Sequence, residues 1–161
     1  MTLEYENAWA KYVSKSKIFQ TPLICWEFYD IISTDASIIK KIQEKWSKKI
    51  DFLATIKLKQ EVVITDKNFK IIFATNTIVN MNGYVPDEII GKSPSFFQGN
   101  ETCNKTKGKI KKALLNLESF KEVILNYKKN GETYWCEIEA HPKFDNQGNF
   151  VNYIAFEKLA S

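Results

Sequence analysis

The stretch that decides the fold is IIFATNTIVNMNGYVPDEIIGKSPSFFQG, residues 71–99. It begins as an apolar strand and then breaks into short segments around Gly83, Pro86 and Gly91, with Pro86 placed to start a helix. This pattern predicts short helical turns after a strand. The last part, GKSPSFFQG, has neither strand nor helix periodicity, so it either lines a pocket or only fills the core.

On both sides of this stretch, short apolar runs alternate with turn signals, which is typical of strands. Asn130 and Gly131 predict a tight hairpin, and residues 105–117 predict an amphipathic helix with lysines on its outer side. The expected strands are residues 61–65, 70–74, 120–129, 132–144 and 149–159. The predicted fold class is therefore α+β: a five-stranded antiparallel sheet with short helices on one face, plus an N-terminal helical extension.

Residues 1–58 have a helical rather than a strand period. Trp9, Tyr12 and Val13 form an apolar stripe, and residues 21–32 read as a second, shorter helix. One long helix is predicted after residues 33–35, with these apolar positions at spacings of three and four: Ile39, Ile42, Trp46, Ile50 and Leu53. We therefore divide the chain into an extension, residues 1–58, used for packing or dimerisation, and a domain, residues 59–161.

Composition excludes several classes of function. With 161 residues, 44% of them hydrophobic, the chain can bury a core of its own. Cys25, Cys103 and Cys136 are odd in number and far apart, which predicts neither a disulfide framework nor a metal site. The chain has no arginine and its lysines are dispersed, so no nucleic-acid partner is expected.

No membrane segment or catalytic motif is visible either. There is no apolar run long enough to cross a bilayer, and the polar N-terminus does not resemble a signal peptide, so a cytoplasmic location is expected. The chain has no phosphate-binding glycine loop, and His141 is its one histidine. The sequence therefore predicts that the protein is not an enzyme and has no catalytic residues.

Residues 60–158 resemble a PAS domain, and within that superfamily they are most similar to the light-oxygen-voltage (LOV) branch. Four blocks occur in the order and spacing of the family: NGY followed by EIIGK, then FFQG, then NYKKNGETYW, and finally YIAFE. The resemblance implies the PAS fold and a role in sensing or signalling. It also implies that the outer sheet face and the flanking helices serve dimerisation and output.

The resemblance also shows where this chain departs from LOV photoreceptors. The family's segment Asn-Cys-Arg-Phe-Leu-Gln carries the cysteine that forms a light-driven adduct with flavin mononucleotide. Here Ser93, Pro94 and Ser95 stand at its first three positions. Proline offers no thiol, and the two serines replace an amide and a phosphate-pairing guanidinium. Adduct chemistry is therefore not expected from this position.

The resemblance provides five candidate cofactor-binding residues. Gln98 and Asn126 match family residues, Asn126 corresponding to an amide at the flavin's pyrimidine edge. Cys136 replaces an asparagine, and Glu157 replaces the glutamine that responds to flavin reduction. An ionised carboxylate in the pocket would have to be desolvated, which is costly. With Ser93, these are the candidate pocket residues; no cofactor is predicted, and flavin mononucleotide (FMN) is the alternative.

Simpler interpretations remain open for the same residues. Phe96 and Phe97 are expected to fill the core, and Cys136 is expected to be a small buried hydrophobe. On the opposite face of the sheet, alternation places an apolar set that must be covered by the N-terminal helices, by a second copy of the domain, or by both. Its members are Val123, Leu125, Tyr127, Trp135, Ile154 and Phe156.

Three functions follow from these patterns. The first is a non-catalytic sensory or signalling PAS module that acts through ligand- or partner-dependent packing at its outer sheet face and N-terminal helices, as a homodimer and towards an unknown signalling partner. The second is a cysteine-less, LOV-like flavoprotein photoreceptor. The third is a structural dimerisation domain whose pocket is filled by side chains.

Overall fold

The computed structural model describes residues 25–160, with side chains described for residues 34–55 and 58–160. The predicted stripe of Trp9, Tyr12 and Val13 lies outside the described residues. The chain divides into two units between Ile32 and Ser33, and every strand described belongs to the second unit. Residues 33–58 thus belong with the sheet, and the proposed boundary at residue 58 stays a prediction.

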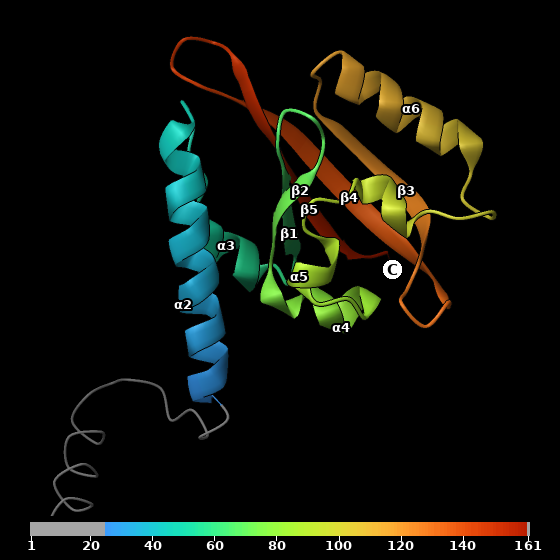
Figure 1. The fold of residues 1–161 in the computed structure, drawn as a ribbon, viewed down its shortest axis with the longest axis horizontal. Coiled ribbons are helices and arrows are strands. Elements are labelled where there is room, and N and C mark those ends of the chain that lie inside the picture. The colour runs from blue at the N-terminus through green and yellow to red at the C-terminus, as the bar shows by residue number, and fades with distance from the viewer. Residues whose placement is uncertain (1–24, 161) are drawn as a thin grey trace, which may run out of the picture. The chain divides into compact units, whose positions relative to one another are not determined.

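Five strands form one antiparallel sheet in the order β2-β1-β5-β4-β3 (Figure 1). The strands are β1 (Glu61–Thr65), β2 (Ile71–Ala74), β3 (Phe120–Tyr127), β4 (Thr133–Phe144) and β5 (Phe150–Leu159). The last strand pairs between the β1–β2 and β3–β4 hairpins, so it joins the two halves of the sheet. The predicted five-stranded α+β fold is confirmed.

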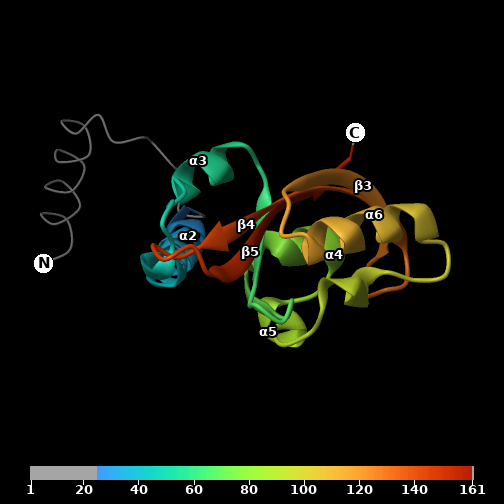
Figure 2. The same ribbon diagram turned by 90° about the horizontal axis from the view of Figure 1, so that it is seen from above.

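Short helices fill the chain between β2 and β3, as predicted. They are η2 (Asn76–Ile78), α4 (Val79–Asn82), α5 (Pro86–Ile89), η3 (Pro94–Phe97) and α6 (Asn104–Leu115). Pro86 and Pro94 each occupy the first position of a helix, where a missing backbone N–H costs nothing. Figure 2 shows α4, α5 and α6 on one side of the sheet and α3 (Phe52–Lys57) on the other.

The inner face of the sheet packs against these short helices. Its buried core is Val63, Ile71, Ala74, Ile78, Met81, Ile89, Phe97, Ile124, Tyr134 and Cys136. Gly99 ends the deciding stretch where the chain passes under the ring of Tyr127, and a Cβ at Gly99 would lie 2.5 Å from that ring. The backbone can approach β3 here only because Gly99 has no side chain.

The outer face of β1 and β5 is covered by residues 33–42 of α2 (Cys25–Ile42) together with η1 (Gln43–Lys45) and α3. Its buried cluster is Ile39, Trp46, Phe52, Val62, Ile64, Phe73 and Ile154. Strands β1 and β5 therefore lie between two apolar layers and are buried on both faces.

The prediction of one long helix over Ile39–Leu53 is wrong. Helix α2 continues through residues 33–35 and ends at Ile42, and Trp46 is extended, with φ −89° and ψ 135°. In this extended stretch the Trp46 indole Nε1 donates a hydrogen bond to Asn152 Oδ1 at 2.8 Å, and the Ser47 N–H donates to the Phe144 carbonyl. As a result Leu53, expected to cover the sheet, is 58% exposed.

The outer face of β3 and β4 lacks such a cover in the described residues. Val123 and Trp135 are exposed there, and Leu125 is half-buried. Ile154 and Phe156, by contrast, pack with the outer cluster. The predicted apolar face therefore exists, but the described helices cover only one half of it.

Candidate functional site

A cavity of about 450 Å³ lies on the inner face of the sheet, bounded by η3 and α6. The sheet contributes residues from four strands, and α6 contributes one side of the helix. The lining residues are Val63, Thr65, Phe69, Ser93, Pro94, Ser95, Phe97, Gln98, Lys107, Ile110, Lys111, Leu114, Leu115, Phe120, Asn126, Ile138, Ala140, Tyr153, Ala155 and Glu157. The lining is mainly apolar with a few polar groups, which is the usual character of a small-molecule site.

The segment GKSPSFFQG both lines the cavity and contributes to the core. Phe97 is 3% exposed, belongs to the inner core and lines the cavity, as predicted. Phe96 is 40% exposed, so its predicted role as a core residue is wrong. Its ring lies 5.2 Å from the Tyr84 ring, with Lys92 Nζ 3.9 Å from its centroid. Consecutive residues of the tight helix η3 point to different sides, so only one phenylalanine can be buried.

Four of the five candidate residues line the cavity: Ser93, Gln98, Asn126 and Glu157. Cys136 does not line it. Its side chain is fully buried in the inner core, and its Sγ lies 3.8 Å from Glu157 Oε2. Burial also raises the pKa of the Cys136 thiol. The thiol is thus a neutral core group behind Glu157, consistent with a small buried hydrophobe.

Two buried polar atoms of lining residues lack a hydrogen-bond partner among the described residues: Asn126 Oδ1 and Thr65 Oγ1. The Tyr134 hydroxyl lies close to the Asn126 and Asn82 amides, but its geometry satisfies neither. A buried acceptor without a partner is costly unless another molecule satisfies it. Asn126 Oδ1 is therefore an unsatisfied acceptor within the cavity wall, buried beside the Tyr134 hydroxyl.

Glu157 is the most unusual group of the site. Its side chain is only 5% exposed, and no ion pair to it occurs within the described part of the chain. Burial raises the pKa of Glu157 to about 7, the contact with Cys136 opposes that rise, and the nearby Glu61 carboxylate adds to it. Near neutral pH the carboxyl is therefore divided between neutral and charged forms.

A second set of hydrogen bonds connects Glu61 with helix α2 through the residues that follow β2. The hydroxyls of Thr75 and Thr77 both donate to Glu61 Oε2, the latter at 2.7 Å. Between them, Asn76 donates its backbone N–H and its side-chain amide to Asp35, at 2.9 and 2.7 Å. Because Glu61 pairs with Glu157 in the β1–β5 register, these contacts join the cavity wall to α2.

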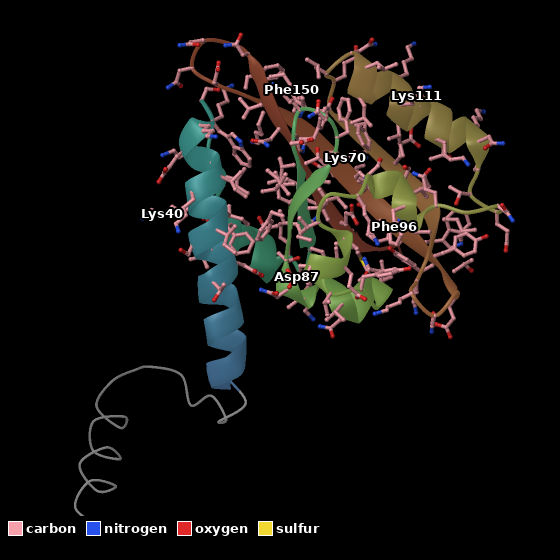
Figure 3. The ribbon with its side chains drawn as sticks, in the orientation of Figure 1. Lys40, Lys70, Asp87, Phe96, Lys111 and Phe150 are labelled. Atoms are coloured by element: carbon pink, nitrogen blue, oxygen red, sulfur yellow. The ribbon has the colours of Figure 1, made fainter. Side chains whose placement is uncertain are left out.

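The sequence interpretation missed the lysines of the cavity. Lys107 and Lys111 lie one turn apart on α6 and line the cavity together with Ile110 and Leu114. Lys107 is half-buried, and Lys111, which Figure 3 labels on α6, is exposed. The spacing of two lysines around Ile110 and Leu114 could have indicated this placement.

Other chemistry is sparse in the described region. Within it, no group of three or more His, Cys, Asp or Glu side chains is arranged to hold a metal ion. None of the described residues that line the cavity is a cysteine, and Pro94 is among them. No helix in the described part of the chain combines the length and apolar character needed to span a membrane.

Comparison with known proteins identifies the family. The PAS domain family matches residues 59–158, well over half of the chain, so the chain belongs to the PAS domain family. Its relatives include a blue-light-activated histidine kinase of Brucella anthropi, 39% identical over 53% of this chain and 17% of that protein. A blue-light photoreceptor of Listeria innocua is 34% identical over 60% of this chain and 39% of that protein.

Solved structures place the chain near the LOV branch. A structure described as "Flavin Analogue Sheds Light on Light-Oxygen-Voltage Domain Mechanism" superposes with a TM-score of 0.64 and 32% identity, covering 68% of this chain and 83% of that one. The dark structure of the blue-light photoreceptor Aureochrome1 LOV has a TM-score of 0.64 and 28% identity, covering 71% and 86%. The two curated relatives are much longer than the region they share with this chain. The chain is a LOV-like sensory domain of the PAS family.

Proposed function

We propose that this domain senses a small molecule held in the inner cavity and transmits its occupancy through packing at the outer sheet face and the N-terminal helices. The observation that carries the proposal is the mainly apolar cavity of about 450 Å³, whose wall includes Asn126 with a buried Oδ1 that has no hydrogen-bond partner among the described residues. Family membership and the similarity to blue-light receptors and kinases support a sensory role.

The output surface proposed is the half-covered outer face. Trp135 and Val123 are exposed on β4 and β3, next to the half of the sheet that α2 and α3 cover. The ion-paired Lys121 and Glu137 lie beside them on the same face, so this surface has apolar side chains with a charged rim, as many interaction sites do. We propose a second copy of the domain, or a signalling partner, as its occupant, in a cytoplasmic setting and without a catalytic role for this chain.

Native mass spectrometry of the purified protein tests the ligand. We expect a bound small molecule that is released on denaturation, and the spectrum reports the oligomeric state at the same time. Asn126→Ala removes the unsatisfied acceptor and should lower occupancy, whereas Asn116→Ala, on the exposed end of α6, should leave it unchanged. A ligand-free protein that no metabolite stabilises against heat would contradict the proposal.

The second candidate is a cysteine-less flavoprotein photoreceptor. It is favoured by the positions of Asn126 and Gln98 on the cavity wall, because both match LOV residues that contact flavin. Asn126 Oδ1 could accept from a ring N–H, and Lys107 and Lys111 could hold a phosphate. A bound flavin would supply light absorption and electron uptake. The lining supplies no thiol, so this reading includes no adduct; a flavin absorption spectrum of the purified protein would establish it.

The third function, a dimerisation domain with a filled pocket, loses its premise. Phe97 was expected to take up the space where the family has leucine, but it packs at the edge of a cavity that remains open. Dimerisation itself stays a prediction.

A further inference from the structure

We infer that the ligand of this cavity is an amphipathic organic amine, bound as its cation with the ammonium group at Glu157 and its apolar body on the sheet beside it. The inference rests on the proposed small-molecule function and names the chemical class of the ligand. Three observations carry it: the buried Glu157 carboxyl has no cation, a second carboxylate adjoins it, and small apolar side chains line the sheet next to it.

Glu157 is a buried acid that faces a cavity without a counter-charge. It lines the cavity and is 5% exposed, and its one hydrogen-bond contact within the described residues is the Cys136 thiol, with Sγ 3.8 Å from Oε2. None of the ion pairs in the described part of the chain includes Glu157. A buried carboxylate requires a cation and hydrogen bonds to compensate for its desolvation, and a thiol is only a weak donor. A ligand with a positive charge and N–H donors supplies both.

The groups around Glu157 favour a cation. Glu61 lies opposite Glu157 in the β1–β5 register, and its carboxylate accepts hydrogen bonds from two threonine hydroxyls. The other titratable groups that face Glu157 are Cys136 and Tyr134 on β4, and neither is a base. Two adjacent carboxyl groups create a negative potential that attracts a cation. A metal ion lacks sufficient ligands, because no group of three His, Cys, Asp or Glu side chains in the described residues is arranged to hold one.

The opposite wall fixes the orientation of the amine. Helix α6 contributes Lys107 and Lys111 to the cavity, and neither lies within ion-pair distance of Glu157 or of any other carboxylate in the described residues. Helix η3 carries no titratable side chain. The two lysines repel a positive group, so the ammonium binds at the sheet rather than at α6.

The sheet beside Glu157 offers an apolar floor for the rest of the molecule. Ala155 is the next residue of β5 on the same face, with Ala140 opposite it on β4 and Val63 opposite it on β1, and all three line the cavity. Same-face neighbours on a strand lie about 7 Å apart, so a body joined to the ammonium by a few atoms lies over the alanines. Burial of that body contributes affinity, because the small side chains leave room for it.

Binding of the cation should be coupled to release of the Glu157 proton. Burial raises the pKa of Glu157 to about 7, so at lower pH the cation must displace a proton. The affinity should therefore increase about tenfold for each pH unit up to this pKa and remain constant above it. An alkyl ammonium group stays charged over this range, as lysine does.

Three indole compounds with the same ring and different end groups test the inference. Tryptamine is a cation at neutral pH, tryptophol is neutral and indole-3-propionate is an anion. Isothermal titration calorimetry at pH 7.5 should show the tightest binding for tryptamine and the weakest for indole-3-propionate. In Glu157→Gln the affinity for tryptamine should fall about ten- to hundredfold, the range for a hydrogen bond to a charged group, and should no longer depend on pH between pH 5 and pH 7. The affinity for tryptophol should be unchanged.

Glu132→Gln is the matched control, because Glu132 is exposed between β3 and β4, lies outside the cavity lining and gives the same change of net charge. It should leave all three affinities unchanged, and circular dichroism reports whether each variant is folded. Equal affinity for tryptamine and tryptophol, tighter binding of the anion, an equal loss in the control, or no binding of any probe overturns the ligand class. The small-molecule function still stands if native mass spectrometry finds a bound molecule. It fails as well if the protein is empty and no metabolite stabilises it against heat.

Discussion

The two halves of the outer sheet face differ both in their residues and in their surroundings. Over β1 and β5, Val62, Ile64 and Ile154 lie beneath α2, η1 and α3 and are fully buried. Over β3 and β4, Val123 and Trp135 face solvent within the described structure and share the face with the ion-paired Lys121 and Glu137. Strand alternation alone creates an apolar face, but whether that face contributes to stability or to recognition depends on what covers it.

Two tryptophans provide the sharpest test of this comparison. Trp46 is 3% exposed and donates to Asn152, whereas Trp135 is 55% exposed. Trp46→Ala should cost about 3–5 kcal/mol of unfolding free energy, because it opens a cavity and removes the partner of a buried amide oxygen. Trp135→Ala should cost about 1 kcal/mol or less.

Urea unfolding of the two alanine variants measures both values under the same conditions. Similar losses in the two variants would mean that the outer face of β3 and β4 is also covered in solution. If only the Trp135 loss grew with protein concentration, the cover would be a second copy of the chain.

Trp46 shows why the end of helix α2 could not be predicted from the sequence. The spacing of Ile39, Ile42 and Trp46 fits a continuing helix, and nothing near Trp46 in the sequence contradicts it. In the structure α2 ends at Ile42, Trp46 donates a hydrogen bond to Asn152, 106 residues away, and Asp51 accepts hydrogen bonds at the start of the separate helix α3. Local periodicity predicts the elements, but it does not report a tertiary hydrogen bond that overrides them.

The candidate site was likewise predicted only in part. The strands were predicted well because each is bounded by turn residues, and the family resemblance provided Asn126, Cys136 and Glu157, which lie on the inner face. Alternation does not report depth along a strand, so it could not separate Cys136, in the core, from Glu157, at the cavity. The cavity itself depends on the placement of α6, which only the folded structure provides.

The second prediction concerns Glu157, whose buried carboxyl lies on the inner face of β5. The pKa of Glu157 rises from 4.5 to about 7 on folding, so the folded state binds the proton more tightly than the unfolded chain. The contribution to stability is full below about pH 4.5 and is lost as the pH rises through 7, a difference of about 3 kcal/mol. Glu157→Gln should remove this loss, as measured by denaturant unfolding between pH 4 and pH 8.

Glu137→Gln is the control of opposite sign. Lys121 lowers the pKa of the Glu137 carboxyl, so its contribution to stability is present above its unfolded pKa and is lost as the pH falls. Its removal should therefore weaken the protein at high pH rather than at low pH. If Glu157→Gln left the pH profile of the parent unchanged, Glu157 would be hydrated and the cavity wetter than the structure indicates.

The third prediction tests what holds the cover on the sheet. Asp35 of α2 is buried and accepts two hydrogen bonds from Asn76. Asp35→Ala leaves both donors without this partner and should cost about 1–3 kcal/mol. Hydrogen exchange should then accelerate in residues 34–42 and remain unchanged in β3. Asp35→Asn keeps one acceptor and should lie between the two, whereas uniform acceleration along the chain would mean that Asp35 serves the whole fold.

The smallest effect on stability is expected at the open half, where the effect on assembly should be largest. Trp135→Lys places a charge in the centre of the exposed surface and removes few packing contacts, so unfolding free energy should change by about 1 kcal/mol or less. If this surface pairs with a second copy, the charge must be desolvated at the interface, and sedimentation analysis should show a shift from dimer to monomer. Ile90→Lys, also at an exposed apolar position but after α5, is the matched control and should not change the mass. A parent protein that is monomeric at every concentration would exclude the second copy and leave a different partner as the occupant of the open half.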